Sequence, residues 1–530
     1  MCSDAARWIR GAGLTLPRAQ ARVADVESNL SIPRWLVAAA LLITLAGLGF
    51  HDLWTPDEPR EAALALAMSR GGDGIIPHLA GTAFVEKPPL YYDLAALWLR
   101  VSPFRAPSAG WLRLTSAFFA LGTLAMTWLL ARRLLGRAAA PLAVLALATL
   151  PGFVHVSHWL LTDVALMFFV TAALAAAAGA YLGGRRALLP LAGLLAAGAF
   201  LTKGLIGPIF IALGALPLLV VSKPWKKSAD DLQALEKETN RQDAKSAKEE
   251  EKTAMSLGGL VALHLAALLA FALPVAAWAG AFWRIGGREL FMEWFWTNHF
   301  GRFSGAATQL GHINGPLFYL GALPLYLLPW LPAIAWLLWR AARDRTQWRD
   351  LAMPLAWGVG GALLLSCSAT KREIYLAPLL PAFALLTAQA LRSLTLRPQI
   401  VVRYAGVLVG LYFAALLIGE PLVNKHKSYG GAFREFDRQV TAQANLRAAA
   451  WDFDETTTAG FYWYADRVFP ALTNRAEAVA VLAGKHPQFN ALVLVHKGDD
   501  QLPKEFANAP ATTVPMGARR TLLLLHTTTP

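Results

Sequence analysis

Long apolar blocks separated by short polar connections dominate the chain between positions 35 and 420. A helix needs about 20 apolar residues to cross a bilayer, so the pattern predicts about eleven membrane-spanning segments, or 13 if two weaker ones are added as a pair. The sequence therefore predicts an all-α polytopic membrane domain over 35–420. The eleven segments lie at 35–50, 111–131, 138–156, 164–182, 187–202, 204–222, 256–283, 315–339, 351–368, 374–391 and 404–420.

The pattern changes beyond Glu420, where the apolar runs become short. ALVLVH at 491–496 and TLLLLHT at 521–527 are too short to span a membrane, and turn-forming residues bound them, so they are predicted to be strands. An amphipathic helix is predicted near 433–450. The region 421–530 is therefore expected to form a small α/β domain outside the membrane.

The distribution of basic residues predicts the topology. Hydrophobic residues make up 56% of the chain, charged residues only 16%, and the net charge is +14. The strongly basic connections all fall on one side if the segment 1–34 is cytoplasmic, as the positive-inside rule requires. This explains the excess of positive charge without a nucleic-acid partner. The basic connections are 132–137, 185–186, 340–349, 392–403 and the charged loop 223–255, which is predicted to be solvated.

Two further features narrow the class of protein. No small-residue cleavage site is apparent near the first apolar run, so that run is expected to be a retained anchor. Cys2 and Cys367 are the only cysteines, and Cys367 lies within an apolar block. Neither a disulfide framework nor a thiolate metal site is therefore expected.

The connection 51–110, on the opposite side from the basic loops, contains an unusual acidic cluster. It begins with Asp57, Glu58, Arg60 and Glu61. A helix that starts after Pro56 would place Asp57, Arg60 and Glu61 on one face. The structural alternative is a simple helix cap, in which Asp57 accepts backbone N–H bonds.

The same connection continues to Glu86 and Lys87, which are followed by two prolines and two tyrosines. The prolines disfavour helix immediately before them, so that the chain can turn back towards the interface. Charge-assisted bonds from Lys87 and Arg60 suit the oxygens of a lipid phosphate. The alternative is that Lys87 only extends its ammonium group from the interface into water, as isolated interfacial lysines commonly do.

Two short motifs place opposite charges at the ends of predicted spans. Asp163 ends the motif LTD at 161–163, and Lys203 lies in LTKG at 201–204. A carboxylate beside hydrocarbon needs a water-filled cavity or a partner. The two residues could therefore line a cavity or pair with each other.

Two further motifs lie in later connections on the same side. His299 and Arg302 in NHFGRF are three residues apart and could contact a phosphate or a metal, although one histidine is weak support for a metal. Lys371 and Arg372 precede Tyr375 and run against the positive-inside bias, which favours a role in anion binding.

Taken in order, these motifs resemble one family. DEPR at 57–60, FVEKPPLYY at 84–92, LTD, LTKG, NHFGRF and KREIYLAPLLPAFALL at 371–386 are similar to motifs of the aminoarabinose transferases of Gram-negative bacteria. These are membrane glycosyltransferases of the GT-C type, related more distantly to protein O-mannosyltransferases. The resemblance implies a polyprenyl (undecaprenyl) phosphate-linked sugar as donor, a membrane-embedded acceptor such as lipid A, and a periplasmic active site in the bacterial inner membrane.

The resemblance also implies roles for individual residues. Asp57 is expected to act on the acceptor hydroxyl, and one base without a second nucleophile implies inversion. No cofactor is required, although a divalent metal ion is possible. The implied roles are catalytic for Asp57 and Asp163, donor phosphate binding for Arg60, Lys87, Arg302 and Tyr375, cavity lining for Glu58, Lys203 and Lys371, and metal binding for Glu86 and His299.

Three alternatives remain open at this point. An enzyme like the protein O-mannosyltransferases would act on Ser or Thr instead of a lipid. A secondary transporter would need inverted repeats and charges near the bilayer midplane, whereas the charges here flank the spans and no repeat is found. A lipid-binding assembly protein would not need the carboxylate of Asp57.

Overall fold

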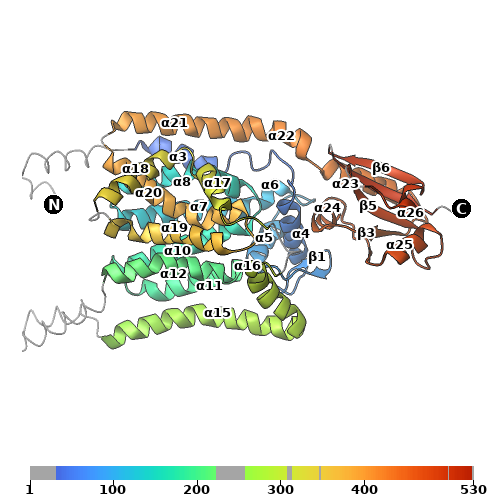
Figure 1. Cartoon of the computed structure of the whole chain (residues 1–530), viewed down its shortest axis with the longest axis horizontal. Helices are drawn as coiled ribbons and strands as arrows, with labels where there is room; N and C mark the ends of the chain where they lie inside the picture. The colour runs from blue at the N-terminus through green and yellow to red at the C-terminus, as the bar shows by residue number, and fades with distance from the viewer. Residues whose placement is uncertain are drawn as a thin grey trace, which may run out of the picture.

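The computed structural model describes residues 32–222, 257–306, 313–344, 348–394, 396–498, 501–517 and 519–527. The predicted cytoplasmic segment before Ile32 and the charged loop 223–255 lie outside these residues. A bundle of long helices makes up most of the molecule, and a β-sheet lies at one end of it (Figure 1).

The first half of the bundle includes the connection 51–110, which folds at the end of the bundle nearest the sheet (Figure 1). The helices of this half are α3 (Arg34–Ile43), α4 (Asp57–Ser69), α5 (Leu90–Arg100), α6 (Ala109–Leu112), α7 (Leu114–Leu134), α8 (Ala139–Ala148), α9 (Pro151–His158), α10 (Thr162–Tyr181), α11 (Leu188–Lys203) and α12 (Ile206–Ser222). The short strands β1 (His78–Leu79) and β2 (Thr82–Ala83) pair as a hairpin between α4 and α5.

The second half of the bundle contains the longest helix, α15. Its helices are α15 (Leu257–Met292), η1 (Glu293–Gly301), α16 (Arg302–Ser304), α17 (Phe318–Leu327), α18 (Leu331–Arg343), α19 (Trp348–Cys367), η3 (Glu373–Leu379), α20 (Leu380–Ser393), α21 (Pro398–Ala414), η4 (Ala415–Gly419) and α22 (Glu420–Lys427).

Each of the eleven predicted segments contains helix, but not every helix is long enough to span a membrane. Among the described residues six helices are long and apolar enough, and eight segments qualify if the bent pairs α8 with α9 and α17 with α18 each count as one. The helices α3, α11 and α12 are apolar but shorter. Length and composition thus support six to eight spans directly.

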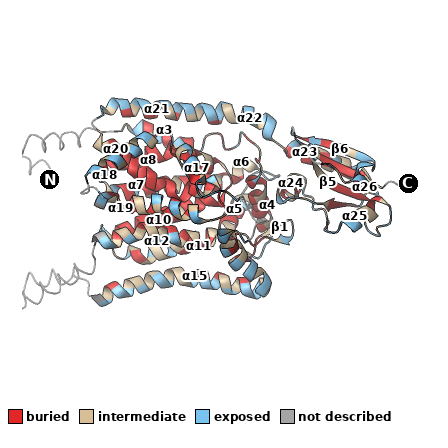
Figure 2. Cartoon of the chain, in the orientation of Figure 1, coloured by how far each residue is buried: buried red, intermediate tan, exposed pale blue. Residues whose placement is uncertain are grey.

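The helices differ sharply in how far the protein covers them (Figure 2). The most apolar windows of α10 and of η3 with α20 are 83% and 89% buried, so these helices form the centre of the bundle. The corresponding window that begins in α15 is only 6% buried, and the one that begins in α21 is 22% buried. Exposed apolar helices of this kind suit contact with lipid.

The C-terminal region is a five-stranded mixed sheet with helices on both faces. The strands β3 (Ala448–Trp451), β4 (Ala471–Leu472), β5 (Ala491–Lys497), β6 (Ala511–Met516) and β7 (Arg520–His526) lie in the order β4-β3-β5-β7-β6. β3 is parallel to β4 and β5, whereas β7 is antiparallel to β5 and β6. The runs at 491–496 and 521–527 are thus strands, as the sequence predicts.

Alternate residues of β5 face opposite sides of this sheet, as the pleat requires. Leu492 and Leu494 pack with α25 (Arg475–Leu482) and α26 (Lys504–Ala507). Val493 packs instead with α23 (Gly430–Thr441) and α24 (Glu455–Ala465). The amphipathic helix predicted near 433–450 is wrong in its length, because α23 ends at Thr441 and 448–451 forms β3.

Candidate active site

A cavity of about 350 Å³ lies where α4, the loop before α5, α10, α11, α12, η1, α19 and η3 meet. Its lining includes five cationic and four anionic side chains, an excess of one positive charge. These are Asp57, Arg60, Glu61, Glu86, Lys87, Asp163, Lys203, Arg302 and Arg372. Apolar side chains also line it, among them Leu161, Leu166, Leu205, Ile206, Ile209, Phe210, Leu364 and Leu365.

Asp57 begins helix α4 and makes the closest ion pair of the cavity. Both oxygens of its carboxylate accept hydrogen bonds from the guanidinium of Arg372, at 2.7 and 2.5 Å. Burial alone would raise the pKa of Asp57, but the hydrogen bonds and charge of Arg372, with the charge of Arg60, outweigh it and lower that pKa. Asp57 is therefore held as a carboxylate.

The predicted shared face of α4 is confirmed. Nη2 of Arg60 lies 3.3 Å from a carboxylate oxygen of both Asp57 and Glu61. The alternative of a helix cap is not found, because Pro56 occupies the N-cap position and no side chain caps the helix there. The start of α4 thus presents Asp57, Arg60 and Glu61 to the cavity.

The pair Glu86 and Lys87 reaches the cavity from the loop before α5. Nζ of Lys87 donates to Glu61 at 2.7 Å, and Glu86 accepts from Arg302 at 2.8 Å. Burial works against the charge on Glu86, yet the charges of Arg60, Lys87 and Arg302 lower its pKa. Burial likewise disfavours the charged form of Lys87, but Glu61 and Glu86 raise its pKa. Both groups stay ionised because each is compensated.

Asp163 and Lys203 are both pairing partners and cavity residues. Nζ of Lys203 donates to Asp163 at 2.6 Å, so the pairing that the sequence left open is present. The same Nζ lies 4.5 Å from the ring centroid of Tyr375, within range of a cation–π interaction. Tyr375 thus fixes Lys203 from a third element, η3.

Gly204 allows His299 to form part of the cavity wall. Its φ of +71° is a left-handed conformation, and a Cβ at this position would lie 2.1 Å from Nε2 of His299. Nδ1 of His299 donates to the carbonyl oxygen of Trp294 at 2.9 Å. The glycine of the motif LTKG is therefore required by the close approach of η1.

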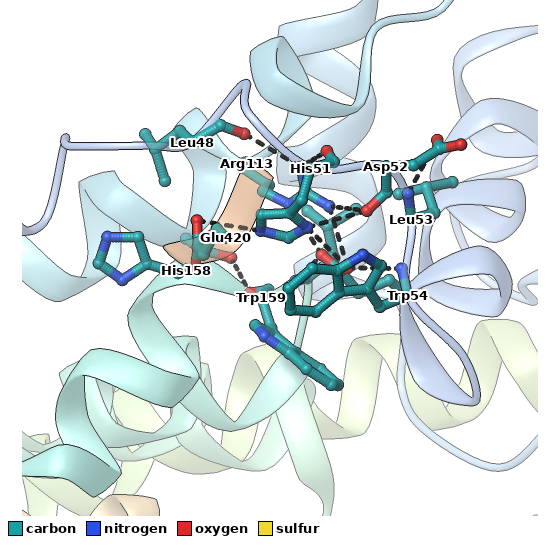
Figure 3. A network of polar contacts seen from close by, with 12 residues as sticks. Leu48, His51, Asp52, Leu53, Trp54, Arg113, His158, Trp159 and Glu420 are labelled. Atoms are coloured by element: carbon teal, nitrogen blue, oxygen red, sulfur yellow. Dashed lines mark hydrogen bonds and ion pairs between the residues drawn. The ribbon is translucent and has the colours of Figure 1, made fainter. Parts of the chain in front are cut away.

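The prediction that Glu58 lines the cavity is wrong, because its side chain is fully buried behind α4. It accepts from Nε and Nη2 of Arg113 at 2.8 and 2.9 Å, and from the backbone N–H groups of Trp54 and Leu160 at 2.9 and 3.1 Å. Figure 3 shows Arg113 among the carbonyl groups of the preceding loop, to which it also donates. Glu58 therefore anchors α4.

The prediction for Lys371 is also wrong, and its neighbour Arg372 is the residue that enters the cavity. Nζ of Lys371 donates to the carbonyl oxygens of Asn314 and Ser368 and thereby ties the loop before η3 to 313–314. Arg372 has an extended backbone, in which adjacent side chains point to opposite sides. The two adjacent basic residues indicated an anion-binding site, but the sequence did not show which of them reaches the cavity.

Glu86 and His299 do not make a convincing metal site. Glu86 is already engaged by Arg302, and Arg60 lies 3.8 Å away. Within the described ranges no group of three His, Cys, Asp or Glu side chains could hold an ion. Two potential ligands, one of them neutralised by guanidinium groups, do not match the donor sets of protein metal sites.

The cavity thus unites most of the predicted site residues. Asp57, Arg60, Glu86, Lys87, Asp163, Lys203, His299, Arg302 and Tyr375 all line it. Arg372 and Glu61 also line it, although neither was among the predicted site residues. Glu61 follows Arg60 directly in the acidic cluster. Its predicted place on the same face of α4 as Asp57 and Arg60 could have identified it as a cavity residue.

Comparison with known proteins finds similar sequences and similar folds. The model of the family described as dolichyl-phosphate-mannose-protein mannosyltransferase matches residues 86–233. The undecaprenyl phosphate-alpha-4-amino-4-deoxy-L-arabinose arabinosyl transferase of Pseudomonas aeruginosa PAO1 is 31% identical over 389 residues, which are 72% of this chain and 64% of that protein. Its namesake from Edwardsiella ictaluri is 27% identical over 421 residues, 75% of this chain and 68% of that protein.

Two crystal structures of ArnT from Cupriavidus metallidurans have the same fold. The form bound to undecaprenyl phosphate superimposes with a TM-score of 0.67 at 18% identity, covering 92% of this chain and 97% of ArnT. The apo form gives a TM-score of 0.63 at 17% identity, with the same coverage.

The chain thus has the fold of these ArnT structures. In sequence it resembles the aminoarabinose transferases, as its motifs indicate, and this resemblance is confirmed. The chain spans about 64% of the length of the Pseudomonas relative that it matches.

Proposed function

We propose that the protein is an inverting glycosyltransferase. It moves an aminoarabinose-like sugar from a polyprenyl phosphate donor to a membrane-embedded acceptor such as lipid A. One observation carries the proposal: a single cavity is lined both by a cluster of fixed charges and by many apolar side chains. A lipid phosphate likewise combines an anionic head with a hydrocarbon tail.

The proposed setting is the bacterial inner membrane, with 11 to 13 spans and a cytoplasmic N-terminus. The basic connections support this sidedness through the positive-inside rule. On that topology α4 and the C-terminal sheet are periplasmic, because both lie at the opposite end of the bundle from the start of α21, where a basic connection ends (Figure 1).

The donor phosphate is proposed to lie between Lys87, Arg302 and Arg60. These cations come from three separate elements and converge on Glu86, at 4.0, 2.8 and 3.8 Å. An entering phosphate would share them through charge-assisted hydrogen bonds. Tyr375 lies beside Lys203, and the apolar side chains of the lining would contact the first isoprene units.

Asp57 is proposed to act on the acceptor hydroxyl. Among the residues that the structure describes, its Oδ2 accepts from Arg372 alone, so lone-pair capacity remains for a hydroxyl donor. The acceptor oxygen forms a bond to the anomeric carbon while the bond from that carbon to the phosphate oxygen breaks. The hydroxyl proton passes to Asp57, and the polyprenyl phosphate leaves with the electron pair.

The cations make this displacement possible by stabilising the departing phosphate. Fixed charges in a water-poor site need no reorganisation during the reaction. The carboxylate of Asp57 adds general-base catalysis, which typically contributes a factor on the order of 10² to 10⁴ in rate. Asp163 is proposed to hold Lys203 in place, since the two are 2.6 Å apart.

A second candidate is transfer to Ser or Thr of a protein. The match of residues 86–233 to a family described by protein mannosyl transfer favours it. The two acceptors can be separated in a Gram-negative host that lacks its own aminoarabinose transferase. Mass spectrometry of lipid A and of envelope glycoproteins, with and without this gene, should show the added sugar on lipid A. A sugar found only on protein would favour the second candidate.

A further inference from the structure

We infer that Glu455 of the C-terminal domain is a positioning residue for Arg60 and limits the affinity of the cavity for anions. The inference rests on the proposed function, because it concerns how the cavity binds a lipid phosphate. It also gives the C-terminal domain, which contains none of the predicted site residues, a part in the site.

Helix α24 of the C-terminal domain packs along α4, the helix that begins with Asp57. The buried ring of Trp463 lies in a cluster with Ala62, Ala65 and Leu66 of α4. At the start of α4 the hydroxyl of Thr456 donates to the carbonyl oxygen of Pro56 at 3.2 Å. After its end Arg70 pairs with Asp466 at 2.5 Å. The contacts run the length of α4, so the position of α24 relative to α4 is fixed.

This docking brings Glu455 to the outer side of Arg60. Nη1 of Arg60 donates to Oε2 of Glu455 at 3.1 Å and lies 3.8 Å from Glu86. Nη2 of the same guanidinium faces inward to Asp57 and Glu61, each at 3.3 Å. Arg60 is therefore held between the carboxylates of the cavity and one carboxylate of the C-terminal domain.

Glu455 differs from the other partners of Arg60 in its exposure. Its side chain is 54% exposed, whereas that of Arg60 is 15% exposed and that of Asp57 is 3% exposed. A half-exposed carboxylate can leave its ion pair and be hydrated by water at little cost in free energy. When a phosphate approaches Arg60, Glu455 is thus the partner that is easiest to displace.

The ion pair between Glu455 and Arg60 changes the net charge that an entering phosphate meets. The cavity itself has one positive charge in excess, and Glu455 cancels it. Glu455 thereby competes with the phosphate for Arg60, which weakens the binding of both the donor and the product. Because the product is itself a polyprenyl phosphate, a weaker hold on the phosphate speeds its release.

The test compares four full-length proteins in nanodiscs of zwitterionic lipid: wild type, Glu455→Gln, Glu455→Asp and Glu505→Gln. Glu505 is a matched control, since it pairs with Arg475 at 2.9 Å within the C-terminal domain and its side chain is 47% exposed. The first readout is the Kd for undecaprenyl phosphate, which needs no sugar. The second is the kcat and KM for sugar transfer.

Glu455→Gln should lower the Kd roughly threefold to tenfold and lower kcat by a similar factor, since one competing charge is lost. Glu455→Asp should lie between Glu455→Gln and wild type, and Glu505→Gln should match wild type. Trp463→Ala, which loosens the docking of α24, should shift the Kd in the same direction as Glu455→Gln.

An unchanged or higher Kd for Glu455→Gln would overturn the inference, even if sugar transfer is intact. A different result would refute the proposed function and leave the inference standing. In that case wild type binds undecaprenyl phosphate and Glu455→Gln binds it more tightly, but wild type transfers no sugar. Wild-type protein that does not bind undecaprenyl phosphate would overturn both.

Discussion

The carboxylate of Asp57 and the guanidinium of Arg372, 315 positions apart in the chain, form a two-point ion pair at 2.7 and 2.5 Å. The side chain of Asp57 is only 3% exposed and that of Arg372 only 19%. Burial raises the pKa of a carboxyl group unless an opposite charge compensates. Arg372 is therefore the main reason that Asp57 is ionised in this cavity.

Replacing Arg372 should change the pH dependence of transfer. In Arg372→Gln, burial of Asp57 is opposed mainly by Arg60, so the pKa of Asp57 should rise from its lowered value. Because transfer needs the carboxylate, the rate is lost as pH falls through this pKa, and a higher pKa moves that loss to higher pH. A pH–rate profile of kcat should show the acid limb displaced upwards. Arg438→Gln, at an exposed pair on α23, should leave the profile unchanged; an identical shift there would contradict the account.

Lys87 should contribute both to donor binding and to stability. Lys87→Met removes the proposed phosphate contact and also the partner at 2.7 Å of Glu61, which is 1% exposed and keeps its ion pair with Arg60 at 3.3 Å. We expect the Kd for undecaprenyl phosphate to rise roughly 10- to 100-fold and the free energy of unfolding to fall by about 1 to 3 kcal/mol.

The double variant Lys87→Met with Glu61→Gln separates the two effects of Lys87. It also removes the buried charge of Glu61 that Lys87 helped to compensate, so thermal stability should recover while phosphate binding stays weak. Thermal unfolding and equilibrium binding, measured on the same preparations, check this. Recovery of binding together with stability would mean that Lys87 acts only in folding.

Gly204 should tolerate no side chain. Gly204→Ala puts a methyl group 2.1 Å from Nε2 of His299 and strains a backbone with φ of +71°, at a cost of about 1 to 3 kcal/mol. The resulting shift of η1 should displace Arg302 and lower transfer activity by more than tenfold, as measured by initial rates. Gly406→Ala is the control, since nothing lies within 4 Å of its added Cβ in helix α21. Equal activity of the two variants would contradict this role for Gly204.

Glu58 should matter for folding and not for chemistry. Glu58→Ala leaves the guanidinium of Arg113, which is 0% exposed, without its carboxylate. Breaking a buried pair in this way typically costs about 3 to 5 kcal/mol. The yield of folded protein and its melting temperature should fall, while the folded fraction should bind undecaprenyl phosphate with nearly the wild-type Kd. A stable variant that has lost binding would place Glu58 in the site after all.

Much of the fold could be predicted because the bilayer imposes a simple pattern on the sequence. The apolar blocks correspond to helices, and the short apolar runs of the C-terminal region correspond to β5 and β7. The pattern of apolar residues could not predict where a helix bends or ends. Two of the eleven segments are helix pairs bent by 64° and 112°, and three contain helices shorter than a span.

The candidate site was predicted where several charged motifs share one side of the membrane. Asp57, Lys87 and Asp163 do line one cavity. The sequence could not tell Lys371 from Arg372, since the choice depends on the direction of each side chain in an extended segment. It also could not predict that Glu58 meets Arg113, or that Glu455 meets Arg60, 395 positions away, because these pairs depend on how distant helices pack.

The most direct test of the account is sugar transfer by the purified protein in proteoliposomes that contain undecaprenyl phosphate-linked aminoarabinose and lipid A. Lipid A is then analysed by mass spectrometry for wild type and for Asp57→Asn, which keeps the size of the side chain and removes its charge. The account predicts sugar-modified lipid A with wild type and a loss of at least 100-fold with Asp57→Asn, in line with the rate contribution of a general base. Equal transfer by the two proteins, or none by wild type, would contradict it.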